Sequence, residues 1–537
     1  MDMTITEIVK GNSDYSTFYD LLNQAGLKDM FDGSTAYTVF VPTNEAFDKL
    51  PAGTLNSLSN DQVKQILEYH TIEGTIPSSQ LQASQDVKSV EGNELYITKE
   101  NGTVTINGNV TVSNPDILAK NGVIHAVDNV ILPPGIRPEN IVDKASADNN
   151  FSTLVQAIKD AGLADALSYT GPYTVFAPTN DAFGKLPSGT LASLSTDQLQ
   201  QILKYHVVQG KVNSTDLTDG ETLTTLEGEK LYVSINNGTV SINGAKVTTA
   251  DLDVSNGVIH VIDNVLLPDA FQNVVQNLQK RPDFSTLVGA VSDAGLASAL
   301  SGDGPFTVFA PTNEAFGKLP AGTLSSLTKD QLTDILKYHV INADIKAMDL
   351  SSEQEATTLN GQKVFITKDG QGNVTVNGSA MVTQADLVSS NGVIHAVDNV
   401  LLPDGFNDVT GIIAKRYQLS KLDSLLNEAG LISALQAQGP FTIFAPSNMA
   451  FDNLPAGTLD NLSASQLQDI LKYHVVQGKI LSSDLQPTQT VQTLNGQSIT
   501  VTVDNGKVMV NGNATVTTAD LTGTNGVIHI IDGVLTP

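Results

Sequence analysis

Every histidine of the chain belongs to one of two repeated motifs. Four of the eight histidines close the string NGVIH, which recurs without change at 121–125, 256–260, 391–395 and 525–529. An aspartate follows each of these histidines three residues later, at Asp128, Asp263, Asp398 and Asp532. The other four histidines close a Tyr-His pair, at His70, His206, His339 and His474. Histidine and carboxylate side chains are common general bases and metal ligands, so the pattern raises the question of catalysis or metal binding.

The chain does not supply the full set of residues that either catalysis or metal binding needs. A zinc site takes three or four ligands, whereas each repeat offers two histidines and the chain has no cysteine. A Ser-His-Asp triad is unsupported as well, because no GxSxG string occurs and a regular strand would point His125 and Asp128 to opposite faces. The sequence therefore predicts no enzymatic activity, no metal site and no cofactor.

The elements that carry the two motifs favour structural roles for the histidines. Leu199, Ile202, Leu203 and His206 fall on one face of a predicted helix, which places the histidine on the core stripe. Tyr205 is expected about 100° away, off that stripe. In NGVIH, the Asn-Gly pair predicts a turn with positive φ that leads into a buried central strand. Both histidine rings are thus expected to pack among apolar neighbours.

The repeated motifs divide the chain into four domains. The NGVIH strings start 135, 135 and 134 residues apart, whereas solenoid repeats have periods of about 20–50 residues. The predicted domains are residues 3–135, 136–269, 270–404 and 405–537. The joints between them (PPGIR, PDA and PDG) contain no Gly/Ser-rich or Pro-rich linker, so neighbouring domains are expected to touch.

Within each domain the predicted helices come mainly first and the strands second. In the second domain, residues 151–167 have the apolar spacing of a helix, and 172–178 are typical of a buried strand. A capping box, Ser/Thr-x-x-Gln, opens the helix that ends in Tyr-His, at Ser59, Ser195, Thr328 and Ser463. Hairpins with NG turns follow. This order predicts an α+β fold.

The composition narrows the class of protein. The formal net charge of -28 argues against binding to nucleic acid or to an anionic membrane. No apolar run approaches the roughly 18 residues of a membrane span. The first residues, MDMTITE, show no signal peptide. An apolar fraction of 40% with 16% charged residues is typical of a globular protein.

Three landmarks in each domain resemble the fasciclin (FAS1) domain family. They are TVFAPTNEAF with small variations at 38–47, 174–183, 307–316 and 442–451, the Tyr-His pair, and NGVIH with its apolar run. The resemblance covers essentially the whole chain as four tandem FAS1-like domains. It implies that each domain is a β-sandwich-like wedge flanked by short helices. It also implies an extracellular location, a role in cell adhesion or matrix assembly, and no catalysis. Because the chain lacks cysteine, we expect a bacterial rather than an animal member.

The resemblance further implies two partner-binding elements. The first is the Tyr-His pair, which corresponds to Tyr69-His70, Tyr205-His206, Tyr338-His339 and Tyr473-His474. The second is an Asp-Ile/Leu pair before NGVIH, which corresponds to Asp116-Ile117, Asp251-Leu252, Asp386-Leu387 and Asp520-Leu521. The residues by themselves favour a packed histidine at a helix end and a turn aspartate followed by a core side chain. Both interpretations remain open at this point.

Two functions follow as hypotheses. In the first, the chain is a secreted or cell-surface protein that binds cell-surface or matrix proteins or glycans through repeated weak surfaces, because tethered copies raise the effective concentration. In the alternative, it is a structural protein whose copies assemble with one another into filaments or a surface layer. Neither hypothesis includes nucleic acid or direct insertion into a membrane.

Overall fold

The computed structural model describes residues 2–537 and divides into two compact units. The first unit ends at Pro268, and the second begins at Asp269. Each unit contains two seven-stranded sheets with short helices around them, which confirms four tandem α+β domains. No helix among the described residues has the length and apolar character to cross a bilayer. Each of the four domains has one sheet. The residues at which the domains begin and end stay predictions.

The first unit holds the first two domains. Its strands are β1 (Tyr37–Pro42), β2 (Thr71–Glu73), β3 (Ser84–Lys88), β4 (Glu94–Glu100), β5 (Thr103–Ile106), β6 (Val110–Ala119), β7 (Gly122–Val127), β8 (Tyr173–Pro178), β9 (Val207–Gln209), β10 (Thr222–Thr224), β11 (Lys230–Asn236), β12 (Thr239–Ile242), β13 (Ala245–Val254) and β14 (Gly257–Ile262). Its α-helices are α1 (Ile5–Gly11), α2 (Ser16–Gln24), α3 (Lys28–Asp32), α4 (Asn44–Asp48), α5 (Thr54–Ser57), α6 (Asn60–Tyr69), α7 (Ile141–Ser146), α8 (Ser152–Asp160), α9 (Ala164–Tyr169), α10 (Asn180–Gly184), α11 (Thr190–Ser193) and α12 (Thr196–Tyr205).

The second unit repeats this arrangement. Its strands are β15 (Phe306–Pro311), β16 (Val340–Ile341), β17 (Glu353–Thr357), β18 (Lys363–Lys368), β19 (Val374–Val376), β20 (Ala380–Ser389), β21 (Gly392–Val397), β22 (Phe441–Pro446), β23 (Val475–Gln477), β24 (Thr488–Gln492), β25 (Ser498–Asp504), β26 (Lys507–Val510), β27 (Ala514–Gly523) and β28 (Gly526–Ile531). Its α-helices are α13 (Val274–Gln279), α14 (Ser285–Asp293), α15 (Ala297–Leu300), α16 (Asn313–Gly317), α17 (Thr323–Ser326), α18 (Lys329–Tyr338), α19 (Val409–Ala414), α20 (Ser420–Glu428), α21 (Ile432–Gln436), α22 (Asn448–Asp452) and α23 (Ala464–Tyr473).

The last strand of each domain lies inside the sheet. In the first domain the strand order is β2-β1-β7-β6-β5-β4-β3, and β7 is parallel to β1 but antiparallel to β6. The pairing of β6 with β7 shifts register on both sides of Asn114. Such bulges bend a strand and increase its twist. The bulged β6 therefore carries the sheet from its β1–β7 half into its β3–β5 half.

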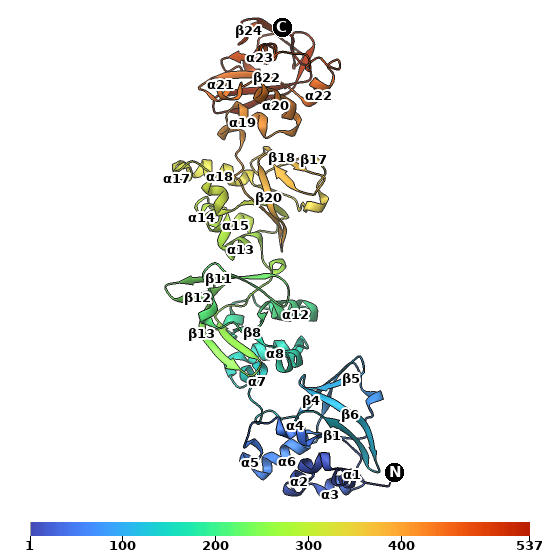
Figure 1. Cartoon of the computed structure of the whole chain (residues 1–537). Helices are drawn as coiled ribbons and strands as arrows, with labels where there is room; N and C mark the ends of the chain where they lie inside the picture. The colour runs from blue at the N-terminus through green and yellow to red at the C-terminus, as the bar shows by residue number, and fades with distance from the viewer. Residues whose placement is uncertain (1) are drawn as a thin grey trace. The chain divides into compact units, whose positions relative to one another are not determined.

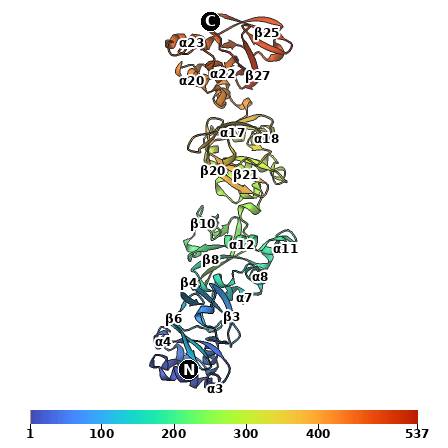
Figure 2. The ribbon, with the colours of Figure 1, turned by 90° about the vertical axis from the view of Figure 1, so that its right-hand side faces the viewer.

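Each domain has two apolar cores, separated by β1 and β7. In β1, Val39 and Val41 enter the core beneath the helices, whereas Phe40 enters a second core with side chains of β4 and β5, because alternate side chains of a strand point to opposite faces. Figure 1 shows the helices of the first domain gathered to one side of its strands, and Figure 2 shows α8 and α12 on one side of β8. This arrangement confirms the β-sandwich-like wedge flanked by short helices.

The tyrosine of the Tyr-His pair lies off the stripe that carries Leu199 and Leu203, as predicted, but its burial in the second core was not predicted. Helix α12 contributes Leu203 to the core beneath the helices and Tyr205 to the second core. The side chains of Tyr69, Tyr205 and Tyr338 are fully buried, and Tyr473 is nearly so. Helical periodicity locates one apolar stripe, and it gave no sign that the last turn of this helix packs against a core on each side.

The glycine of NGVIH is required by the parallel pairing of the last strand with the first. Gly122 has a φ of 149°, and a Cβ atom there would lie 1.9 Å from the carbonyl oxygen of Tyr37. Asn121 beside it accepts a hydrogen bond from the backbone N–H of Ile5 (3.0 Å) and donates one to the carbonyl of Phe31 (2.6 Å). The motif thus joins α1 and α3 to the central strands.

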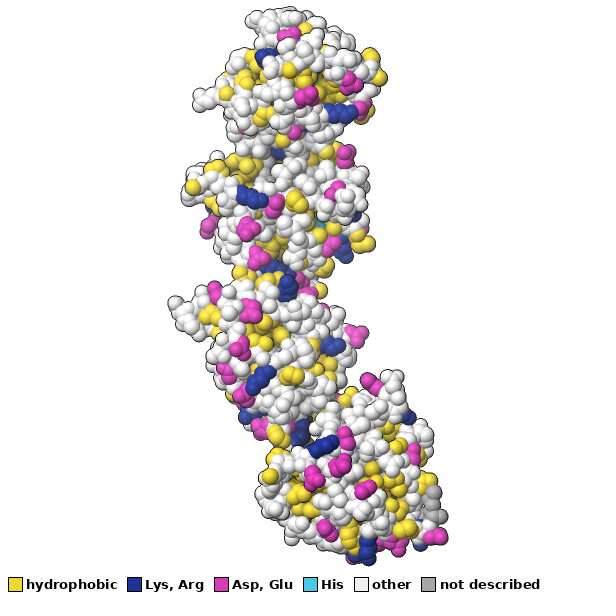
Figure 3. All heavy atoms as spheres, viewed as in Figure 1, with side chains coloured by type: hydrophobic (Ala, Val, Ile, Leu, Met, Phe, Trp, Pro, Cys, Tyr) yellow, Lys and Arg dark blue, Asp and Glu magenta, His cyan; other side chains and the backbone are white. Residues whose placement is uncertain are grey.

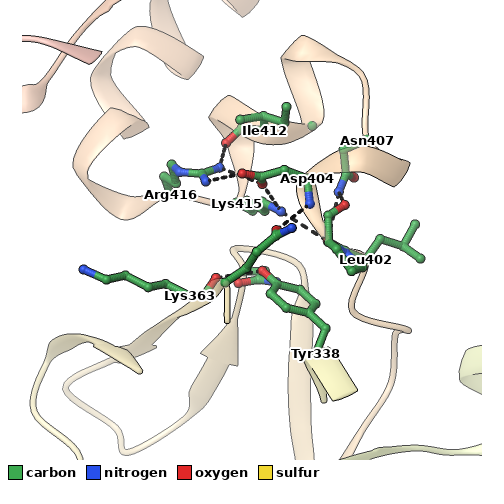
Figure 4. A network of polar contacts seen from close by, with 12 residues as sticks. Tyr338, Lys363, Leu402, Asp404, Asn407, Ile412, Lys415 and Arg416 are labelled. Carbon is green, nitrogen blue, oxygen red and sulfur yellow. Dashed lines mark hydrogen bonds and ion pairs between the residues drawn. The ribbon is translucent and has the colours of Figure 1, made fainter. Parts of the chain in front are cut away.

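A buried ion cluster lies where the third and fourth domains meet within the second unit (Figure 4). Asp404 accepts two hydrogen bonds from Arg416, at 3.2 and 2.7 Å, and forms an ion pair with Lys415. Rings of the third domain cover both cations. Lys415 Nζ lies 5.2 Å from the ring centroid of Tyr338, and the guanidinium carbon of Arg416 lies 4.9 Å from that of Phe365. The predicted contact between these neighbouring domains is therefore present.

The charges of this cluster depend on one another. Burial raises the pKa of the Asp404 carboxyl, but the hydrogen bonds and charges of Arg416 and Lys415 outweigh burial and hold the pKa below its usual value. Burial lowers the pKa of the Lys415 ammonium to about 8, although the Asp404 carboxylate opposes this change. Removal of one member leaves the others buried without their counter-charge.

We predict that Asp404→Asn destabilises the second unit far more than loss of a surface ion pair. Two buried cations would lose their carboxylate, which costs about 3–5 kcal/mol in the free energy of unfolding. The matched control is Asp452→Asn, which breaks the exposed pair with Lys421 and should cost about 1 kcal/mol or less. Calorimetric unfolding of the full-length variants measures both. If both variants lost the same free energy of unfolding, the prediction would be contradicted.

Candidate partner-binding site

The histidine of each Tyr-His pair uses both ring nitrogens inside the domain. In the first domain, Nδ1 of His70 lies 2.7 Å from the carbonyl oxygen of Ile66, and Nε2 lies 3.0 Å from the backbone N–H of Ile131. A carbonyl only accepts and an amide N–H only donates, so Nδ1 carries the proton and the ring is neutral. The same two bonds, at 2.8–2.9 Å, recur at His206, His339 and His474. These four histidines have no free lone pair for a metal ion.

The histidine of NGVIH is held in the opposite tautomer. Nε2 of His125 lies 2.9 Å from the carbonyl oxygen of Ile76 and donates to it, while Nδ1 accepts from the backbone N–H of Asp116 at 3.1 Å. The ring also stacks on Phe40, with centroids 5.6 Å apart. His260, His395 and His529 make the corresponding bonds. The structural interpretation of the NGVIH histidines, as packed side chains, is confirmed.

Burial favours the neutral form of six histidines. It lowers the pKa of His70, His206, His339 and His474 to about 4, although the hydrogen bond to a helix carbonyl raises it. Burial also lowers the pKa of His125 and His529, against the opposing effects of a backbone hydrogen bond and a nearby aspartate. Since the unfolded chain binds these protons at higher pH, the folded state loses stability as the pH falls from about 6.5 towards 4.

The tyrosine of each Tyr-His pair fixes a hairpin of the second core. The hydroxyl of Tyr69 donates to the carbonyl of Glu94 at 2.9 Å and accepts from the side-chain amide of Asn107 at 3.0 Å. Asn107 opens an NG turn and has a φ of 50°. Tyr205, Tyr338 and Tyr473 make the same pair of bonds, with Asn243, Asn377 and Asn511. These asparagines were missed as partners, although the repeated NG pairs predicted the turns.

The aspartate of each Asp-Ile/Leu pair joins two distant segments. Asp116, Asp251, Asp386 and Asp520 all have φ between 58° and 62°. The Asp116 carboxylate accepts from the backbone N–H of Ser78 at 2.7 Å and from its hydroxyl at 2.5 Å. Asp251 and Asp520 hold Ser214 and Ser482 in the same way. In the third domain Ala347 replaces the serine, so Asp386 receives only the backbone bond, at 2.9 Å.

These serines also keep the aspartates charged. Hydrogen bonds from Ser78 and Ser214 hold the pKa of Asp116 and of Asp251 below the usual value. For Asp520, burial raises the pKa, but the hydrogen bonds from Ser482 outweigh burial and lower it. No local pattern indicated Ser78, Ser214 and Ser482 as partners, because each lies 37 or 38 residues from its aspartate.

The structure places the two implied partner-binding elements at different depths. The tyrosines and histidines of the Tyr-His pairs are buried. Ile117, Leu252 and Leu521 are half-buried and Leu387 is buried, all against the core beneath the helices. The carboxylates of Asp116, Asp251 and Asp520 are exposed, and Asp386 is half-buried. Partner binding by any of these residues stays a prediction, and the aspartates are the ones that a partner reaches directly.

The aspartate after NGVIH caps a neighbouring strand. Asp128 Oδ1 accepts from the backbone N–H of Thr111 at 2.7 Å, and Asp263, Asp398 and Asp532 make equivalent bonds to Lys246, Met381 and Thr515. These carboxylates are therefore engaged in the sheet, away from the imidazole of the same motif. Across the described residues, no cluster of three or more histidine, aspartate or glutamate side chains could hold a metal ion.

We predict that four of the eight histidines stay neutral in the folded protein until the pH approaches 4. NMR titration of the ring C–H signals tests this, with His→Gln variants to assign each signal. Each of the four helix-end histidines should add up to ~3 kcal/mol of acid destabilisation, because its pKa rises from about 4 to 6.5 on unfolding. A helix-end signal that titrates near pH 6.5 before unfolding would refute the assignment.

The comparisons with known proteins agree with this architecture. The family model of the fasciclin domain matches residues 13–133, 149–268, 282–403 and 417–537. The chain is 32% identical over 523 residues to transforming growth factor-beta-induced protein ig-h3 of Sus scrofa, covering 95% of this chain and 74% of that protein. It is 30% identical over 527 residues to periostin of Homo sapiens, covering 95% and 61%.

A shorter relative matches a single domain. Protein sll1483 of Synechocystis sp. is 52% identical over 132 residues, which is 24% of this chain and 73% of that protein. The same conclusion follows from the family matches, from the two relatives that match 95% of the chain, and from the fourfold recurrence of one wedge-shaped domain. The chain belongs to the fasciclin domain family and carries four fasciclin domains in tandem.

Proposed function

We propose that the chain is an extracellular adhesion or matrix protein, without catalytic activity, that binds through the aspartates of its four Asp-Ile/Leu pairs. One observation carries the proposal. Among the implied partner-binding residues, the aspartates present charged oxygens at the surface, whereas the Tyr-His pairs are buried. The family resemblance supplies the adhesive role and the extracellular location, and the chain matches its full-length relatives over 95% of its own length.

The partner that fits these sites carries positive charge. The net charge of the chain is -28, and Asp and Glu side chains are scattered over the visible face of the domains in Figure 3. Each Asp-Ile/Leu site offers a carboxyl group beside a half-buried or buried aliphatic side chain. Hydrogen bonds hold the pKa of Asp116, Asp251 and Asp520 below the usual value, so these three are ionised. A lysine or arginine on a cell-surface or matrix protein matches this surface. Because such contacts are exposed, binding should weaken as the salt concentration rises.

Four weak sites on one chain bind more strongly than one. A second site engages at the effective concentration set by the first, which raises overall affinity by about 10²–10⁴ without new contacts. Loss of one aspartate should therefore weaken attachment only modestly, and loss of all four should abolish most of it.

The test is a full-length variant with Asp116→Asn, Asp251→Asn, Asp386→Asn and Asp520→Asn. Asparagine tolerates the positive φ at these positions, so the variant should fold. Cells of the source organism are allowed to attach to a surface coated with either protein. We expect the fourfold variant to lower the effective affinity by about a hundredfold or more, as the loss of multivalent attachment implies.

The control removes four other exposed carboxylates, one per domain, by Asp48→Asn, Asp160→Asn, Asp293→Asn and Asp460→Asn. Its net charge equals that of the first variant, and it should attach like the unmodified chain. Equal losses in the two variants would show a general charge effect and would overturn the proposed sites. Filaments or sheets of the pure protein in electron microscopy, with no attachment of cells, would instead favour the self-assembling structural protein.

A further inference from the structure

Within the first unit, two tyrosines stack where the first and second domains meet. Tyr96 of β4 and Tyr169 at the end of α9 have ring centroids 6.0 Å apart and an interplanar angle of 11°. The guanidinium carbon of Arg137 lies 5.2 Å from the centroid of the Tyr169 ring. This stack fixes which other side chains face each other across the joint.

The stack brings carboxylates together. Asp86 of β3 is the cross-strand partner of Tyr96, and Glu94 lies on the same face of β4, two residues before Tyr96. Asp165 lies one helical turn before Tyr169 on the same face of α9. Asp165 therefore meets Asp86 and Glu94 from the other side of the joint. Arg137, the cation beside the stack, forms an ion pair with Asp143 at 3.2 Å.

The neighbouring carboxylates change the pKa of Asp165. Burial raises its pKa to about 6, and so do the charge of Asp86, a hydrogen bond with the Asp86 carboxyl and the charge of Glu94. Other titratable or charged groups near the stack include Tyr69, Tyr169, Arg137 with its partner Asp143, and Glu91 beside Tyr69. The folded joint binds a proton between pH 3.8 and about 6 that the separated carboxyl would release. Acid therefore favours the closed joint, and a pH above about 6 disfavours it.

The joint between the third and fourth domains has balanced charges at the same places. Phe365 occupies the position of Tyr96, and its cross-strand partner is Glu355. Lys363 stands where the first domain has Glu94, and it pairs with Glu355 at 2.5 Å. Ser433 occupies the position of Asp165. Arg416 and Tyr417 both contact the Phe365 ring, at 4.9 and 6.1 Å. The two joints share an aromatic contact and differ in their charges.

We propose that the joint between the first and second domains is a pH-operated hinge, loosened when Asp165 is ionised opposite Asp86 and Glu94 and closed when Asp165 is protonated. The joint between the third and fourth domains keeps its geometry over the same pH range. This inference is independent of the proposed adhesive role. Domains one and two of the array would thus become rigidly joined only in mildly acidic surroundings.

The absence of cysteine makes a direct test possible. Spin labels are attached to the full chain through Asp20→Cys and Gln156→Cys, at equivalent exposed positions of α2 and α8. A second doubly labelled chain carries Gly289→Cys and Ser424→Cys, the equivalent positions of α14 and α20. Double electron–electron resonance, with a chelator present, gives the distance distribution of each pair at about pH 7.5 and about pH 5.

We expect the distance distribution of the first label pair to narrow when the pH is lowered, and the distribution of the second label pair to stay unchanged. Discounted for the half-buried position of Asp165, the ratio of closed to open joints should rise about tenfold between these pH values. Glu94→Lys, which copies Lys363, should give the narrow distribution already at neutral pH, and so should Asp165→Asn. Matching circular dichroism spectra confirm that these surface variants fold. A first pair whose distribution does not change with pH, or a Glu94→Lys variant as broad as the unmodified chain, would overturn the hinge.

Discussion

Each domain depends on the residue that ends its capped helix, because three elements meet there. The ring of His70 binds α6 through Nδ1 and the segment after β7 through Nε2, and the carbonyl of the same residue accepts from Phe40 of β1 at 2.9 Å. Loss of the ring would leave a buried amide N–H and a helix carbonyl without partners, which is costly in an apolar interior. The second histidine then ties the last strand to the Asp-Ile/Leu segment. The invariance of both motifs within the chain is thus explained by packing.

The features that the sequence predicted are those with a local signal. The capping boxes at Ser59, Ser195, Thr328 and Ser463 are present, and so are the NG turns with positive φ at Asn107 and Asn243. The burial of the histidines followed from their place on an apolar stripe. The burial of the tyrosines was not predicted, because one stripe was assumed where α6, α12, α18 and α23 touch two cores. The Ser78–Asp116 bonds and the rings over Lys415 and Arg416 join residues far apart in sequence, for which no local pattern exists.

The four domains share their interior contacts and differ in the residues at their surfaces and joints. Their sheets, histidine bonds and tyrosine bonds recur four times, which leaves little room for separate functions in the interior. Differences lie at the Asp-Ile/Leu segments, where Ala347 replaces a serine, and at the joints, where Glu94 corresponds to Lys363. In this tandem array a few surface residues differ from domain to domain, while the fold of each domain stays constant.

The position of the last strand governs the order in which each domain is completed during synthesis. Strand β7 lies between β1 and β6, yet it leaves the ribosome after both, and its first contact with β1 joins Tyr37 to Gly122. Neither core is complete until β7 has been synthesised. The apolar faces of α2 and α6 therefore stay exposed to solvent while most of the domain is translated. The chain passes through this exposed stage four times, once for each NGVIH. Newly made domains are therefore most open to mispairing just before their final strand emerges.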